Sequence, residues 1–142
     1  MRTVIGIGSD HGADAIGWRV VERLRTKGLS DTNLVLAREP SDILRFLDAT
    51  KVLHLVDACI GPETGRLHTI DWPDPQLAKL SWKTTHGIDV PGALELADVL
   101  GILPPLVTLW CIECDPSSGE CNAILESVTE AIFRKISTVD GQ

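Results

Sequence analysis

The sequence lacks any hydrophobic run long enough to cross a membrane. No stretch of the 142 residues approaches the roughly 20 consecutive apolar residues that a membrane-spanning helix needs. It also lacks an excess of positive charge, because 13 lysines and arginines stand against 20 aspartates and glutamates, for a net charge of −7. Such a chain is attracted neither to nucleic-acid phosphates nor to anionic lipid. We therefore expect a soluble protein that binds neither nucleic acid nor membranes.

Cysteine is scarce, and export features are missing. The N-terminus carries one basic residue and a short apolar run without a small-residue cleavage site, which predicts a cytoplasmic protein. The four cysteines are then expected to be reduced thiols, since a domain of this size does not need disulfides. A zinc site built on Cys111, Cys114 and Cys121 would need a fourth ligand, from Cys59 or a histidine. What these cysteines do is left open.

Several common catalytic signatures are absent. The chain has no Gly-x-Ser-x-Gly turn of the serine hydrolases and no His-Glu-x-x-His helix of the zinc proteases. Gly6 and Gly8 begin a dinucleotide-binding fingerprint, but its third glycine position is His11. Glu39 follows a predicted strand where a ribose-binding acid would stand, so a small nucleotide-binding domain remains an alternative.

Hydrophobic periodicity predicts strands that alternate with helices. Apolar runs predict strands at residues 3–8, 33–37, 52–56 and 106–112, and an alternating pattern predicts an edge strand at 65–70. Apolar stripes predict helices at residues 13–27, 89–100 and 125–136, and a further helix that begins at Pro40. Residues 71–83 look irregular, and we expect the tail from Ser137 to be frayed.

This order of elements predicts an α/β fold. We expect a three-layer sandwich in which a mostly parallel twisted sheet of about five strands has helices on both faces. The length corresponds to a single domain over residues 1–142, which we expect to be a monomer. In such folds the functional residues lie near the carboxyl ends of the strands, where the loops converge.

Two carboxylates and one imidazole stand at these positions. Asp14 follows the first strand, Asp57 follows the third, and His86 precedes the helix at residues 89–100. Oxygen and imidazole ligands suit a divalent transition metal, so the three side chains are candidate metal ligands. They also have ordinary structural explanations, because an aspartate can stabilise a helix start or a turn. Asp10 and His11 are close enough in sequence to Asp14 to line the same cleft.

The chain resembles the hydrogenase maturation proteases, small endopeptidases that trim the C-terminal extension of the large subunit of nickel-iron hydrogenases. The segments that carry the resemblance span nearly the whole sequence: Gly6-Ile7-Gly8, Asp14–Val21, Val56-Asp57-Ala58, Thr85-His86-Gly87, Ala93–Ala97, Leu100-Gly101, Pro105 and Ile112-Glu113. The most specific is Thr85-His86-Gly87 with the helix that follows it.

The resemblance implies an aspartic-type, metal-dependent endopeptidase whose catalytic and metal-binding set is Asp14, Asp57 and His86. The partner implied is a hydrogenase large-subunit precursor. The metal implied is nickel contributed by that substrate, or another divalent transition metal. We further expect Asp10, His11 and Glu39 to contact the substrate.

One departure from the family keeps an alternative open. Members of the family carry an Asp-Gly-Gly-Thr type turn after the second strand, a turn linked with substrate recognition, whereas this chain has Arg38-Glu39-Pro40-Ser41. The exact substrate is therefore undecided. A nickel-dependent recognition or chaperone module that does not cleave its partner is the second hypothesis.

Overall fold

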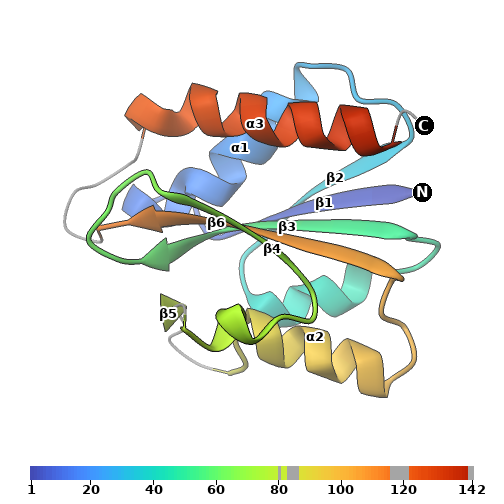
Figure 1. The fold of residues 1–142 in the computed structure, drawn as a ribbon. Coiled ribbons are helices and arrows are strands. Elements are labelled where there is room, and N and C mark those ends of the chain that lie inside the picture. Colours follow the sequence, from blue (N-terminus) through green and yellow to red (C-terminus); the bar gives the residue numbers. More distant parts are fainter. Residues whose placement is uncertain (80, 83–86, 116–121, 141–142) are drawn as a thin grey trace.

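A central sheet lies between two helical layers (Figure 1). The computed structural model describes residues 1–79, 81–82, 87–115 and 122–140. Five strands form a path in the order β2 (Thr32–Ala37), β1 (Arg2–Ile7), β3 (Val52–Ile60), β6 (Leu106–Cys114) and β4 (Leu67–Asp71). The first four strands of this path are parallel, whereas β4 and the two-residue β5 (Ser81–Trp82) pair antiparallel with β6 and β3. The α/β sandwich predicted from the sequence is confirmed.

The sheet is apolar on both sides because both sides are covered. Helices α1 (Ile16–Arg25) and α3 (Asn122–Asp140) lie on one face, and α2 (Val90–Val99) lies on the other with the 3-10 helices η2 (Pro40–Phe46) and η3 (Pro75–Lys79) (Figure 1). Successive strand residues point to opposite faces. Val4 and Val56 accordingly join the core under α1 and α3, while Ile5 and Leu55 join the core over α2.

The helices differ from the prediction at their ends. The predicted helix at 13–27 begins with a separate 3-10 turn, η1 (Gly12–Ala15), and the helix that opens at Pro40 is 3-10 throughout. The tail from Ser137, expected to be frayed, continues α3 to Asp140. None of the helices in the described part of the chain is long and apolar enough to cross a membrane.

Strand β3 is longer than its apolar run predicts. β6 pairs with it over its whole length, from Val52 opposite Leu106 to Ile60 opposite Cys114. Asp57 therefore lies inside a strand and does not follow one. The neighbouring strand β1 has ended by that point, because its last pair with β3 joins Gly6 to Val56.

The cysteines are separated by the sheet. Cys59, Cys111 and Cys114 are buried free thiols. Cys59 and Cys111 belong to the core over α2, whereas Cys114 belongs to the core under α1 and α3. Residues three apart in a strand point to opposite faces, so Cys111 and Cys114 cannot bind one zinc ion together. Cys121 lies outside the described residues.

Candidate functional site

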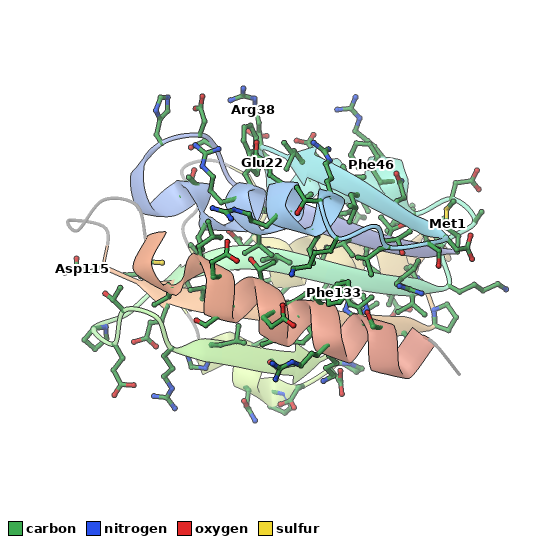
Figure 2. All side chains as sticks on the ribbon, turned by 90° about the horizontal axis from the view of Figure 1, so that it is seen from above. Met1, Glu22, Arg38, Phe46, Asp115 and Phe133 are labelled. Carbon is green, nitrogen blue, oxygen red and sulfur yellow. The ribbon has the colours of Figure 1, made fainter. Side chains whose placement is uncertain are left out.

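The parallel strands all end at the same edge of the sheet, at the left of Figure 1. We call it the carboxyl edge. β1 leads there into the loop that ends in η1, and β2 leads there into Arg38 and Glu39. Asp115, which follows β6, marks the same edge in the view of Figure 2. The predicted site residues that the structure describes lie along this edge.

Asp57 is a buried carboxylate at this edge. Its exposed fraction is 9%, and its place in β3 puts its side chain on the face of α2, the same face as Cys59. The Asp57 Oδ1 atom accepts a hydrogen bond of 2.8 Å from the backbone N–H of Ala58. A buried carboxylate needs such donors, because burial without partners costs several kcal/mol. The Asp57 carboxylate is thus a fixed acidic group inside the sheet at this edge.

Asp14 lies over the end of β1. Its backbone carbonyl accepts a hydrogen bond of 3.2 Å from the N–H of Ser9, which closes η1 back onto the strand. A Cβ atom on Gly8 would clash with this carbonyl oxygen and would stand 3.6 Å from Asp14 Oδ1. Glycine is therefore required at position 8. The 3-10 helix η1 also contacts β3, the strand that contains Asp57. Asp14 and Asp57 therefore lie at the same edge of the sheet.

His86 lies outside the described residues. The chain is described again from Gly87, and Asp89 is the N-cap of α2, where it accepts a hydrogen bond of 2.8 Å from the N–H of Gly92. This cap was expected from the sequence. Helix α2 covers the sheet face on which Asp57 lies.

The three predicted substrate-binding residues lie at the carboxyl edge but are exposed. Asp10 and His11 form a surface pair, with 3.2 Å between His11 Nε2 and Asp10 Oδ1. Glu39 caps η2, where its N–H donates to Asp42 Oδ2 at 3.2 Å. Arg38 stands over the ring of Trp18 at 5.3 Å from its centroid. All of these groups are available to a partner that covers the edge.

The structure adds an acid–imidazole pair that the sequence argument missed. His68 Nε2 and Glu113 Oε1 are 3.1 Å apart, and the other Glu113 oxygen accepts from the N–H of Glu63. These two hydrogen bonds, the one from His68 first, lower the pKa of Glu113. The register places Asp57 opposite Cys111 and Cys111 opposite His68, so the pair shares the sheet face of Asp57.

A signal for this pair was present in the sequence. Glu113 is a charged residue at the end of a run predicted to be buried, and such a residue calls for a partner. The partner comes from β4, which is 45 residues away in the chain. That pairing depends on the strand order, which the local pattern of either segment does not specify.

The acidic groups of the edge also act on the thiols beside them. Burial, together with the smaller effects of the nearby carboxylates of Glu113 and Asp57, raises the pKa of Cys59 to about 11. Burial likewise raises the pKa of Cys111 far above its usual value. A thiol must lose its proton to bind a metal or to act as a nucleophile. At neutral pH these two buried thiols are therefore protonated and poorly suited to bind a metal or to act as nucleophiles.

The glycines of the partial nucleotide fingerprint have packing roles. A Cβ atom on Gly6 would clash with the backbone of Gly17 in α1, and one on Gly8 would clash with Asp14. These glycines let α1 and η1 approach the strand. The carbonyl of Asp14 occupies the space over Gly8 that a bound phosphate would need.

The candidate ligands suit a divalent transition metal in kind, since carboxylate and imidazole ligands are common in such sites. The described residues supply the two carboxylates, Asp14 and Asp57. No group of three or more histidine, cysteine, aspartate or glutamate side chains that could hold a metal ion is found within the described ranges.

Comparison with solved structures identifies close matches to the fold. The chain superposes on the hydrogenase maturating endopeptidase HybD from Escherichia coli with a TM-score of 0.72 and 19% identity, covering 97% of this chain and 93% of that one. A hydrogenase 2 maturation peptidase from Thaumarchaeota archaeon gives 0.64 and 26%, covering 99% and 97%. The maturation protease HycI from Thermococcus kodakarensis gives 0.63 and 22%, covering 92% and 88%. No family model and no curated protein sequence matches the chain.

Proposed function

We propose that this chain, which has the fold of the hydrogenase maturation proteases and resembles them over nearly its whole length, is itself an endopeptidase that matures a hydrogenase. The substrate is the precursor of a nickel-iron hydrogenase large subunit, and the cleavage removes its C-terminal extension after nickel insertion. The observation that supports this proposal is that Asp14, over the end of β1, and Asp57, in the neighbouring strand β3, both lie at the carboxyl edge of a sheet with this fold.

The chain's own residues would act on the substrate as follows. Asp14 and Asp57, with His86 from the loop before α2, hold the substrate's nickel beside the bond to be cut. A metal at that place polarises a carbonyl or lowers the pKa of a water molecule. A carboxylate of the pair takes the proton of the attacking water. The exposed groups of Asp10, His11 and Glu39 contact the precursor around the site.

The direct test is cleavage of a nickel-loaded large-subunit precursor, followed by mass spectrometry of the product. Asp14→Asn, Asp57→Asn and His86→Gln keep the size of each side chain and remove its charge or ligand atom. We expect each to slow trimming by about a hundredfold or more, because a general acid or base typically contributes at least that much to the rate. Asp98→Asn, an exposed acid on α2, is the matched control and should trim at the normal rate.

A metal-binding measurement tests whether the three side chains bind nickel, independently of whether the protein cleaves its substrate. Nickel ions alone, added to the labelled protein, should broaden NMR signals around Asp57, and the three variants should weaken this effect. Precursor without nickel should stay untrimmed. Normal trimming by all three variants would refute the site.

Two other outcomes would support the other hypotheses. An intact precursor that stays bound to the protein would indicate a recognition module that does not cleave, as the altered Arg38–Ser41 loop suggests. A rise in melting temperature with dinucleotides and none with nickel would indicate a nucleotide-binding domain, because only a ligand that prefers the native state stabilises it.

A further inference from the structure

A cavity of about 300 Å³ lies at the opposite end of the strands from the proposed protease site. It opens where β3 and β6 begin, near Met1, and Figure 2 shows Met1 and Asp115 at opposite ends of the molecule. Val52 and Leu106, the first residues of the two strands, line it, and Lys135 of α3 lines it from the helical layer above. Nothing in the proposed protease activity uses this end.

Three polar residues form a row across the floor of this cavity. His54 of β3 stands opposite Thr108 of β6, and Thr108 stands opposite Asp71 of β4. All three line the cavity. The hydroxyl of Thr108 donates a hydrogen bond of 2.9 Å to Asp71 Oδ1. The rest of this sheet face is an apolar core, so the row is a local exception to the burial pattern.

His54 contributes a buried hydrogen-bond donor that has no partner among the residues the structure describes. Its exposed fraction is 4%, and its Nε2 atom makes no hydrogen bond within the described part of the chain. Its other ring nitrogen, Nδ1, lies 3.1 Å from the indole Nε1 of Trp110. An indole N–H can only donate, so Nδ1 is the acceptor and the proton of the neutral ring is on Nε2.

The charge state of His54 follows from its surroundings. Burial, together with the smaller effects of the Arg2 and Lys135 cations, lowers its pKa to about 4, and Asp71 opposes this shift. The ring is therefore neutral at pH 7 and carries one N–H. An unpaired buried donor costs about 1–3 kcal/mol, so the site has a strong preference for an acceptor.

The cavity as a whole favours an anion with an apolar body. Two cations, Arg2 and Lys135, act on His54 against one carboxylate, Asp71, which already accepts from Thr108. Lys135 Nζ lies 5.3 Å from the centroid of the Trp110 ring, and Lys135 and His54 line the same cavity. The remaining lining is mostly apolar, including Val52, Pro105 and Leu106. A volume of this size suits a small molecule, at the lower end of the usual range for ligand sites.

We propose that this cavity binds a small organic acid, whose carboxylate accepts a hydrogen bond from His54 Nε2–H and pairs with Lys135 while its apolar part lies against Val52 and Leu106. The site is separate from the proposed protease site, and its test does not depend on any cleavage.

The test is an NMR titration of the isotope-labelled full chain at pH 7. The probes are butyrate and phenylacetate, and their neutral controls are butyramide and phenylacetamide, which keep the shape and lose the charge. The reporters are the ring nitrogens of His54 and the indole N–H of Trp110. We expect both acids, and neither amide, to shift these signals in a saturable way.

A pair of neighbouring variants on α3 tests the charge. Lys135→Gln should weaken binding of the acids by about fivefold, the effect of losing one partly solvated ion pair. Arg134→Gln removes the same charge one residue away, where the side chain is 76% exposed and pairs with Glu130. It should leave the affinity within about twofold of the original. Melting curves of both variants establish that the fold is intact.

Three results would overturn the proposal. The first is no saturable shift of the His54 and Trp110 signals up to tens of millimolar acid. The second is equal binding of acids and amides, since the carboxylate would then contribute nothing. The third is a long-lived bound water on His54 Nε2–H that neither acid displaces, because an internal water would account for the donor.

Discussion

Two buried polar side chains on β3, Asp57 and His54, are only three residues apart but lie on opposite faces of the sheet. Asp57 points to the face of α2 near the carboxyl edge, where its Oδ1 atom accepts a hydrogen bond from the N–H of Ala58. His54 points to the face of α1 and α3 near the start of the strand, with one ring nitrogen unpaired within the described residues. A buried polar group in a strand is costly, so each calls for its own explanation. The catalytic role proposed for Asp57 and the separate ligand proposed for His54 are these explanations.

The buried His54 makes stability depend on pH. Its pKa is about 4 in the folded protein and 6.5 when unfolded, so below pH 6.5 the unfolded chain binds a proton that the folded chain does not. Stability is complete above pH 6.5 and falls as the pH drops toward 4. The groups facing the ring are Arg2, Lys135 and Asp71. We expect the free energy of unfolding to fall by about 2 kcal/mol between about pH 7.5 and pH 5.

Urea denaturation across this pH range checks the prediction. His54→Gln keeps an acceptor for Trp110 and does not titrate, so its stability should vary less with pH than that of the original protein. The same loss of stability in both proteins would mean that other groups cause it.

At the scale of elements, the proposed site depends on how closely α1 approaches the sheet. A Cβ atom on Gly17 of α1 would stand 2.6 Å from the carbonyl oxygen of Val56 and 2.8 Å from that of Ile7. Both contacts are with strand backbone, which cannot give way as a side chain can. The helix can therefore lie against the end of β1 and the middle of β3 only because position 17 has no side chain. This contact holds η1, and with it Asp14, over the edge.

Gly17→Ala should consequently destabilise the protein by about 2–3 kcal/mol, through overpacking that outweighs the better helix propensity of alanine. Gly101→Ala is the comparison, because its Cβ would meet nothing within 4 Å and its φ of +75° adds only the strain of a left-handed residue, about 1 kcal/mol. Denaturant midpoints of both variants give the order. An equal or smaller loss for Gly17→Ala would contradict this account of the helix–sheet contact.

At the scale of the whole molecule, the two proposed sites lie at opposite ends of the strands. The carboxyl edge carries acidic groups and the proposed protease site. The amino end carries the cavity with His54 Nε2, which has no partner among the described residues. Between them the two cores cover both faces of the sheet and contain Cys59, Cys111 and Cys114. A reagent reaches these thiols only when the protein opens.

Alkylation of the thiols should therefore report unfolding of the whole molecule. The pKa of Cys59 is about 11, so roughly one molecule in a thousand carries the thiolate at about pH 8. We expect iodoacetamide to label Cys59 and Cys111 at least about a hundredfold more slowly in the native protein than in urea. Peptide mass spectrometry measures each site separately. Labelling that is fast in the native state, or that Gly17→Ala fails to accelerate, would show a local opening instead.

The sequence alone determined the order of the elements and the kind of layer each belongs to. Apolar runs and stripes report burial directly, because residues that face a core must be apolar at a spacing of 2 in strands and about 3.6 in helices. Helix capping could also be predicted from the local sequence, since Asp89 was expected to cap α2 and does so. The family resemblance and the fold class followed from these patterns and are supported by the structural matches.

The tertiary structure decided what depends on pairing between distant segments. β3 extends past Asp57 because β6 accompanies it, and His68 meets Glu113 because β4 lies beside β6. The row of His54, Thr108 and Asp71 forms only because β3, β6 and β4 pair in one particular register. No local sequence pattern specifies that pairing. Each of these contacts joins residues whose neighbours in the chain do not specify the partner. The place of His86 stays a prediction, since it lies outside the described residues.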